Sequence, residues 1–280
     1  MNKTKKTSII AKPRKYVLVS PTTTLESSFP KNRTSICSSQ GSIVEAAGQA
    51  DKGSIWISET TKRTVDLENA LYKFYGAKHG KVKFGKLFTM GEINPNSQSL
   101  LSGWFDRIYV TTSALPKEEL AEVLVLPEDI RKDLFIGGRV IRRNRLIVLV
   151  RGDMSTLVVP FSMFSPSPTA RPNFRDFGIG DYGNTLRFGN YESTADVVLW
   201  EMDADYRKRT KDKAKQSATG LGPALRRLRI QRGLSQSDFG NISRKTISRV
   251  ENGEIEKPQK NTLETIARRL NVKPEEIESY

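Results

Sequence analysis

The chain has 280 residues and a formal net charge of +15, because 46 Lys and Arg side chains stand against 31 Asp and Glu. The single cysteine, Cys37, excludes an intrachain disulfide framework and a thiolate zinc cluster, and the single histidine, His79, excludes catalytic triads and metal sites built on imidazole. The basic excess favours a polyanionic partner, so we expect the protein to bind nucleic acid. We expect neither a metal nor a cofactor.

The composition also predicts where the protein acts. Apolar residues near the start of the chain are interrupted by Lys, Pro and Arg, so they cannot form the core of a signal peptide. No stretch approaches the roughly 18 uninterrupted apolar residues of a membrane-spanning helix. We therefore expect a cytoplasmic, nucleoid-associated protein without membrane contact. Residues 1–14 are polar and basic and predict a flexible arm.

Residues 15–126 are expected to form an α+β domain. The stretches 54–58 (SIWIS) and 107–112 (RIYVTT) are typical of strands, and Pro116 is expected to open a short helix. This region offers no nucleophile paired with a base, so we predict no catalytic residue and no enzyme activity.

Between those strands, apolar side chains at helical spacing predict a helix over 66–75 with Thr64 as its cap. The stretch 72–88 interleaves aromatic residues with lysines, which suits a stacking platform for single-stranded nucleic acid. The alternative is the end of a helix followed by a strand with Val82 and Phe84 facing inward. We favour this alternative because period-2 alternation alone explains the pattern.

Residues 127–205 are expected to form a second, small α+β domain. Two apolar, β-branched runs, 146–150 and 157–159, are joined across a Gly-Asp pair and predict a hairpin. Farther on, the Ser-x-x-Asp spacing that starts at Ser193 is typical of a capping box and predicts a long helix through Tyr206. The run LIVLVRGDMSTLVVPFSMF resembles the small domain of unknown function (DUF2442-like) that some bacterial regulators carry, and this resemblance supplies no catalytic residue.

One glycine-rich motif, GIGDYG at 178–183, matches the Gly-x-Gly-x-x-Gly pattern of dinucleotide binding. A proline-rich loop precedes these glycines and a strand-like run follows them, so no helix N-terminus would meet the phosphates. We interpret them as turn glycines.

The basic charge is concentrated at the C-terminal end. Residues 207–280 contain 18 Lys and Arg against 9 Asp and Glu. Residues 206–219 are highly charged and predict a linker or a connecting helix.

Residues 220–280 predict an all-α domain of five helices. Ser235 and Ser243 are expected to cap the second and third helices, and the third helix buries Ile247 and Val250. The five helices are expected over 222–233, from Gln236, over 243–252, over 261–270 and from Pro274.

Two runs in this domain, RIQRGLSQSDF and SRKTISRVENG, resemble the Cro and phage-repressor (XRE-type) helix-turn-helix family. The resemblance covers about a fifth of the chain and implies a lambda-repressor-like fold whose third helix enters the major groove of double-stranded DNA. It also implies a charge pair between Arg229 on the first helix and Glu251 at the end of the third. The residues that it places at the DNA are Gln236, Ser243, Arg244, Lys245, Thr246, Arg249 and Asn252.

The chemistry of these side chains suits the roles that the resemblance implies. Gln236 would contact the DNA backbone, and Arg244, Lys245 and Arg249 would read bases. A guanidinium donates two parallel hydrogen bonds to O6 and N7 of guanine, whereas lysine offers one flexible charge. Thr246 would add a phosphate or methyl contact.

The run departs from the family pattern in one respect. About three residues are missing between Gln236 and Ser243, so we expect a clipped second helix and a turn that relies on Gly240 and Asn241. The angle of the recognition helix, and with it the set of side chains that reach bases, is open at this point.

These features predict a sequence-specific transcriptional regulator, a homodimeric repressor whose palindromic operator has half-sites about one helical turn apart. Its N-terminal region would mediate dimerisation, contact a protein partner or sense a signal. The alternatives are a DNA-targeted effector or enzyme in which residues 15–125 act, and an antitoxin that represses its own operon.

Overall fold

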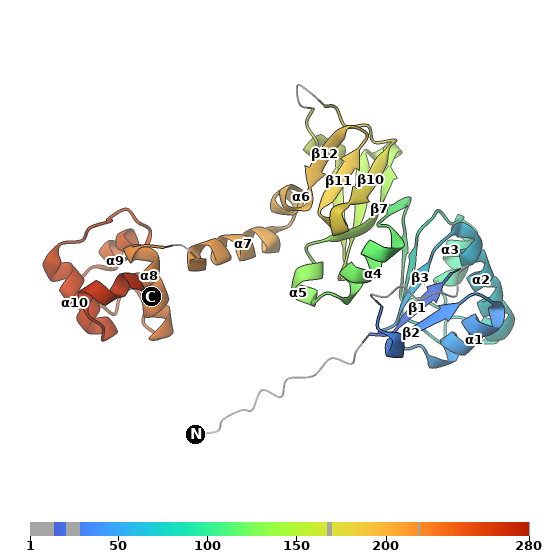
Figure 1. The fold of residues 1–280 in the computed structure, drawn as a ribbon, viewed down its shortest axis with the longest axis horizontal. Helices are drawn as coiled ribbons and strands as arrows, with labels where there is room; N and C mark the ends of the chain where they lie inside the picture. The colour runs from blue at the N-terminus through green and yellow to red at the C-terminus, as the bar shows by residue number, and fades with distance from the viewer. Residues whose placement is uncertain (1–13, 21–28, 167–169, 218, 280) are drawn as a thin grey trace, which may run out of the picture. The chain divides into compact units, whose positions relative to one another are not determined.

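The computed structural model describes residues 14–20, 29–166, 170–217 and 219–279 (Figure 1). The expected arm, residues 1–14, lies outside the described residues except for Arg14. The chain divides into two units, residues 1–202 and residues 203–280. The expected division of the first unit at residue 126 stays a prediction.

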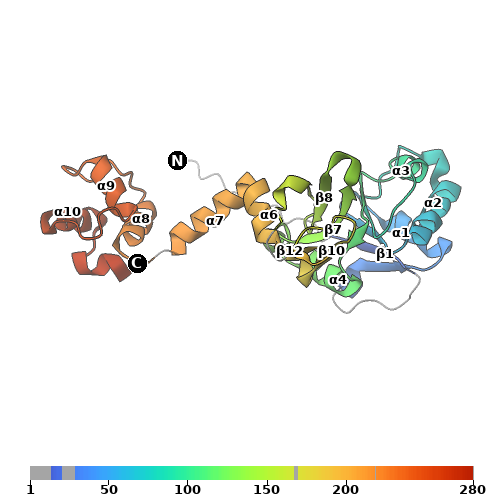
Figure 2. The ribbon, with the colours of Figure 1, turned by 90° about the horizontal axis from the view of Figure 1, so that it is seen from above.

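The first unit begins with a parallel sheet of five strands in the order β2-β1-β3-β4-β5. Its strands are β1 (Tyr16–Val19), β2 (Thr34–Cys37), β3 (Ile55–Ser58), β4 (Lys86–Thr89) and β5 (Arg107–Val110). The helices α1 (Gln40–Gln49), α2 (Thr61–Tyr75) and α3 (Pro95–Leu101) connect successive strands from β2 to β5 (Figure 2). The predicted mixture of helices and sheets is confirmed, and the structure adds that this sheet is parallel.

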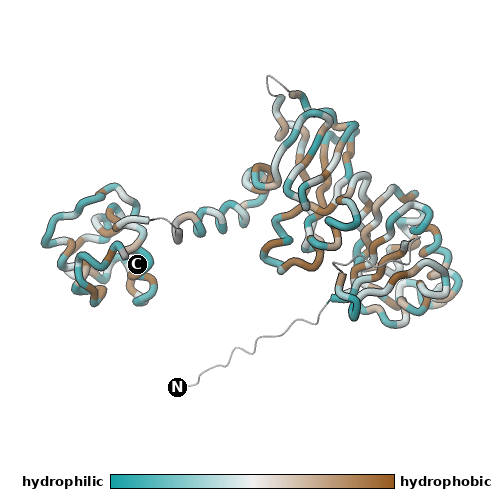
Figure 3. The backbone as a smooth tube through the Cα atoms, in the orientation of Figure 1, coloured by the Kyte–Doolittle hydropathy of each residue, from teal (hydrophilic) through white to brown (hydrophobic). Residues whose placement is uncertain are grey.

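The core of the parallel sheet is aromatic. Trp56 on β3 lies fully buried between Phe84 and Phe105, with ring centroids 6.2 and 5.7 Å away. Its indole N–H donates to the carbonyl oxygen of Phe84 at 2.9 Å. In Figure 3 brown, apolar segments run along these strands, as expected when both faces of a parallel sheet are covered.

The structure corrects two details around α2. The helix is capped by Thr60, whose side chain accepts from the N–H of Arg63, whereas Thr64 lies buried inside the first turn and bonds the hydroxyl of Ser58 at 2.8 Å. The expected strand around Val82 and Phe84 does not form, because β4 begins only at Lys86. Phe84 nevertheless faces the core, so burial and not strand pairing explains the apolar spacing there.

The rest of the first unit contains two antiparallel sheets. Four strands pair in the order β6-β7-β8-β9 and three in the order β10-β11-β12. The four are β6 (Ser113–Ala114), β7 (Phe135–Ile141), β8 (Leu146–Arg151) and β9 (Thr156–Pro160), and the three are β10 (Phe177–Gly180), β11 (Thr185–Phe188) and β12 (Tyr191–Thr194). The helices are α4 (Lys117–Val125), α5 (Glu128–Arg131) and α6 (Ala195–Met202). Short 3-10 helices cover Lys31–Arg33, Gly76–Lys78, Arg142–Asn144, Phe161–Met163 and Asp181–Gly183.

The predicted hairpin is present, since β8 pairs antiparallel with β9. The glycines of GIGDYG occupy β10 and the turn into β11, so a strand and not a helix follows them. The long helix expected through Tyr206 is divided into α6 and α7 (Ala204–Ser217). The reason is Asp203, whose carboxylate accepts from the N–H groups of Asp205 and Tyr206 and so caps a new helix.

The second unit is helical, as predicted. It contains α7, α8 (Leu221–Gln231), α9 (Arg244–Glu251), α10 (Lys260–Leu270) and a terminal 3-10 helix (Pro274–Ser279). Its own core is built from Ala224, Leu225, Leu228, Phe239, Ile247, Val250, Ile266, Ala267, Leu270 and Ile277. The expected second helix is not formed, because residues 232–243 are turns and loop.

Candidate nucleic-acid interface

The helix α9 owes its position to one local cap and one buried face. Ser243 is extended, and its hydroxyl accepts from the N–H of Thr246 at 3.0 Å, which satisfies a free donor of the first turn. Ile247 and Val250 are fully buried. The opposite face therefore points to solvent.

The helices α8 and α9 cross at close range. Gly222, in the first turn of α8, leaves no room for a Cβ atom, which would collide with the carbonyl oxygen of Val250 and lie 3.1 Å from that of Glu251. Only glycine permits this approach, so the residue at position 222 sets the distance between the two helices.

A buried ion pair joins the same two helices. Arg229 donates from Nε and Nη2 to the two carboxylate oxygens of Glu251, at 2.5 and 3.0 Å. The hydrogen bonds that Arg229 donates to Glu251 raise the pKa of its guanidinium. Gln236 donates from Nε2 to Glu251 at 2.9 Å, and Arg229 also donates to the carbonyl oxygen of Leu234 at 2.9 Å. The Glu251 carboxylate therefore ties the loop before α9 to both helices.

The loop that replaces the expected second helix has its own hydrogen bonds. The N–H of Ser235 donates to the carboxylate of Asp238 at 2.6 Å, and hydrogen bonds from the backbone and then the side chain of Ser235 lower the pKa of Asp238. Arg269 on α10 donates to the carbonyl oxygen of Asp238 at 2.7 Å. Gly240 takes the left-handed conformation with φ +63°, and Asn241 does not. Eight residues between Leu234 and Ser243 are too few for a capped helix and its two connections, so a loop forms.

An open hollow of about 810 Å³ lies between this loop and α9. It is lined by Gln236, Arg244, Lys245, Ser248, Arg249 and Glu254. Arg249 donates to Glu254 at 3.2 Å, whereas Arg244 and Lys245 are exposed and have no side-chain partner among the described residues. Two uncompensated cations at the start of a helix face solvent here, which is an arrangement suited to an anionic ligand.

The structure brings together only part of the expected site. Gln236, Arg244, Lys245 and Arg249 share the hollow. The hydroxyls of Ser243 and Thr246 bond each other at 2.9 Å. The sequence reasoning missed Glu254, and its position five residues after Arg249 on an exposed turn was the available signal.

Asn252 lies at the other end of α9, where it is exposed and its backbone N–H closes the last turn. The seven residues expected at the DNA therefore lie in three places: around the hollow, at the cap of α9 and at the other end of α9. Their contacts with DNA stay a prediction.

The first unit also contains a cavity, which is a weaker candidate for a ligand site. A cavity of about 340 Å³ is lined by Lys15, Asn32 and Arg33 among others, but it lies at the amino ends of β1 and β2, whereas open α/β sheets bind ligands at the carboxyl ends. His79 bonds the carbonyl oxygen of Leu100 at 2.8 Å and contacts the ring of Trp104, which gives it a structural role.

The described residues contain neither a metal-binding cluster nor a helix that could span a membrane. No group of three or more His, Cys, Asp and Glu side chains is placed there to hold a metal ion. None of the helices described combines the length and apolar character that crossing a membrane requires.

Comparison with known proteins identifies part of the second unit. Residues 225–277 match the family model described as helix-turn-helix, of the Cro/C1 type. The resemblance seen in RIQRGLSQSDF and SRKTISRVENG is therefore confirmed, and this segment is a DNA-binding regulatory domain of the XRE type. No curated protein and no solved structure matched the chain. The resemblance of residues 127–205 to the small domain of unknown function stays a prediction.

Proposed function

Because residues 225–277 are a helix-turn-helix domain, we propose that the protein is a sequence-specific transcriptional repressor that places α9 in the major groove of double-stranded DNA. The observation that carries the proposal is the pair of exposed cations at the amino-terminal end of α9, Arg244 and Lys245, whose side chains have no partner among the described residues. In this family of domains the N-terminal residues of the recognition helix meet base edges.

The side chains divide between reading bases and gripping the backbone. Arg244 can donate two parallel hydrogen bonds to a guanine, and Lys245 supplies a single charge to a base or phosphate. Arg249 must exchange its bond with Glu254 for one with DNA, so we expect it to contribute less. Gln236 uses one amide hydrogen for Glu251 and keeps a second for a phosphate oxygen.

We further propose a homodimer held by the first unit. The two-fold symmetry of a dimer corresponds to that of a palindromic operator. Linking two half-site contacts raises the affinity for DNA without adding contacts within either half-site. Sedimentation of the full chain and of residues 203–280, which have their own core, tests this proposal. A monomeric fragment and a dimeric full chain support it, and a dimeric fragment contradicts it.

Selection from a random duplex library with the full chain tests sequence specificity. We expect enrichment of a motif with dyad symmetry, loss of that motif in the variant R244A/K245A, and its retention in the control K257A/K260A. The control removes the same charge from two exposed lysines of the same unit outside α9. If the unmodified protein enriches no motif, the proposal is wrong.

Repression is tested separately. Transcripts next to the bound sites should rise when the coding sequence is deleted and fall again when the protein is restored. Transcripts that fall on deletion would make the protein an activator.

A further inference from the structure

One end of the four-stranded sheet presents a cluster of arginines. The strands β7 and β8 and the turn between them contain Arg139, Arg142, Arg143 and Arg145 within seven positions, and all four residues are exposed. We call these four residues the arginine cluster. The sequence contains no Asp or Glu from position 134 to position 152.

Within the described structure, the arginine cluster also has no acidic partner in space. None of its four guanidinium groups makes a hydrogen bond or ion pair within the described part of the chain. Other arginines of the same unit are compensated: Arg151 lies 3.3 Å from Asp133, and Arg187 lies 3.2 Å from Glu192. Four like charges that repel one another and lack counter-charges favour an external anion.

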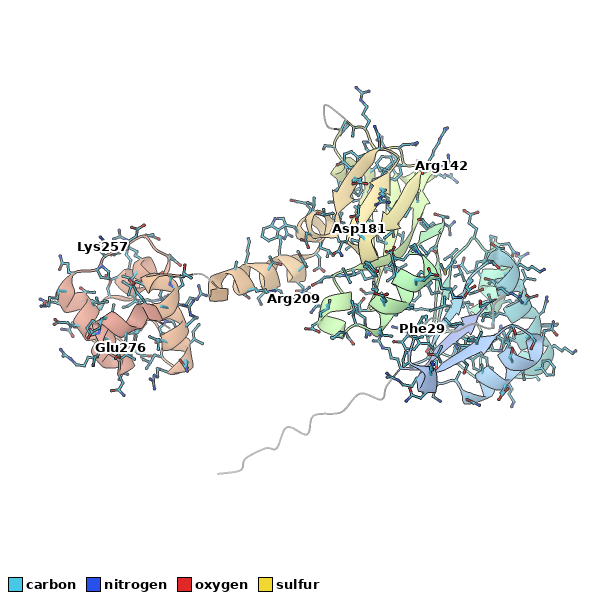
Figure 4. All side chains as sticks on the ribbon, in the orientation of Figure 1. Phe29, Arg142, Asp181, Arg209, Lys257 and Glu276 are labelled. Atoms are coloured by element: carbon cyan, nitrogen blue, oxygen red, sulfur yellow. The ribbon has the colours of Figure 1, made fainter. Side chains whose placement is uncertain are left out.

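The backbone under the arginine cluster is held in place. Arg145 takes the left-handed conformation and donates its N–H to the carbonyl oxygen of Arg142 at 3.1 Å. Its own carbonyl oxygen accepts from Phe161 at 2.9 Å, which ties the turn to the end of β9. Figure 4 shows Arg142 projecting from this end of the sheet. A ligand would therefore order side chains but not a loop, which lowers the entropic cost of binding.

A second basic segment adjoins the same end of the sheet. The ring of Phe161 stacks on that of Phe174, with centroids 3.7 Å apart, and so packs the segment 170–176 beside the turn. This segment adds Arg171 and Arg175, which are exposed and whose side chains have no partner among the described residues. The basic surface thus extends over two separate parts of the chain.

We propose that the arginine cluster binds the phosphate backbone of duplex DNA as a contact separate from the helix-turn-helix domain. The proposal rests on the proposed function, because a chain held on DNA by one unit offers its second basic surface a high local concentration of phosphate. The planar guanidinium matches two phosphate oxygens, which explains the use of arginine at all four positions. Protein–DNA hydrogen bonds go largely to phosphates, which position a protein without reading sequence.

The test measures the salt dependence of binding by the full chain to a 40-base-pair duplex of mixed sequence. The variant R139Q/R142Q/R143Q, which we call the hairpin variant, should bind at least tenfold more weakly at about 0.1 M salt. Its slope of log K against log salt should fall by about two to three units, since each phosphate contact contributes about 0.9. The control K52Q/K62Q/K81Q removes the same charge from exposed lysines of the same unit and should change the slope by less than one unit.

The recognition-helix variant R244A/K245A, measured on the same duplex and on any selected operator, separates the two proposals. A hairpin variant that behaves like its control while R244A/K245A loses binding overturns the arginine cluster contact alone. A weakened hairpin variant with an unaffected R244A/K245A overturns the role of α9 and keeps the contact.

Two other outcomes would also overturn the contact. In the first, the hairpin variant loses binding to vesicles with 30% phosphatidylglycerol, while its slope of log K for DNA against log salt is unchanged. This result would assign the surface to membrane binding. The other is aggregation of the variant with unchanged DNA binding, which would mean that the arginines protect the end of β7 that β6 leaves unpaired from pairing with another chain. If the triple variant does not fold, the single variant R142Q at the exposed turn should still lower the slope by about one unit.

Discussion

Arg229 and Glu251 stand 22 positions apart in the chain and are joined by two parallel hydrogen bonds. The side chain of Glu251 is 2% exposed and that of Arg229 is 13% exposed. A buried carboxylate thus holds the end of α9 against α8. The orientation of α9, and so the direction in which Arg244 points, depends on this pair.

Replacing Glu251 by alanine leaves the Arg229 cation buried without its partner. We expect Glu251→Ala to destabilise the second unit by about 3–5 kcal/mol. Urea unfolding of residues 203–280 measures the change. The control Glu254→Ala breaks an exposed pair with Arg249 and should cost no more than about 1 kcal/mol. Equal midpoints for the two variants would contradict the structural role of the buried pair.

Replacing Gly222 by alanine tests the crossing of α8 and α9. Alanine is the better helix former by about 1 kcal/mol, so a purely local effect would stabilise the protein. We expect destabilisation by about 1–3 kcal/mol instead, because the new methyl group meets the backbone of α9. Gly76→Ala is the matched control, since Gly76 is helical and a Cβ there has no atom within 4 Å. Thermal unfolding of both full-length variants should show shifts of opposite sign.

Replacing Arg244 by alanine separates base reading from charge. We expect Arg244→Ala to lose about 1–3 kcal/mol on the selected operator and to relax the preference at one base pair. Lys208→Gln, on the exposed face of α7, should weaken all duplexes equally and lower the salt slope by about one unit. Titrations on the operator and on a scrambled duplex compare the two variants. An equal loss on both duplexes for Arg244→Ala would make this residue a phosphate contact.

The carboxylate of Asp238 predicts a pH dependence. Hydrogen bonds from Ser235 lower the pKa of Asp238, so this group stabilises the fold above its unfolded pKa of about 3.9. That contribution is lost as the pH falls from about 4 through the lower pKa of the folded state. Asp238→Asn should therefore be less stable than the unmodified fragment 203–280 at pH 7 and equally stable near pH 2. A constant difference at all pH values would refute this origin of the effect.

The single cysteine predicts the behaviour of the first unit toward thiol reagents. Burial raises the pKa of Cys37 to about 12, and the residue is fully buried. Because the thiolate is the reactive form, we expect no labelling by iodoacetamide at pH 8 in the folded protein and complete labelling in urea. Mass spectrometry of the intact chain counts the adduct. Rapid labelling without denaturant would show that the edge strand β2 opens readily.

Features that depend on residues close together in the chain could be predicted from the sequence. Ser243 and the spacing of Ile247 and Val250 define α9, because a cap and an apolar face lie within eight residues. The family resemblance also indicated the partner of Arg229. The same resemblance named Gln236, Arg244, Lys245 and Arg249, which the structure gathers around one hollow, and their contacts with DNA stay a prediction.

Features that depend on contacts between residues far apart in the chain became clear only from the tertiary structure. The parallel order of the first sheet could not be predicted, since strand direction depends on pairings between segments far apart in the chain. Gln236 donates to Glu251, 15 positions farther along the chain, although the resemblance assigns this amide to the DNA backbone. Only folding places Arg145 beside Phe161 and so joins two basic segments into one surface. In each case the contact joins residues that are far apart in the chain, so helix or strand periodicity in the sequence cannot reveal it.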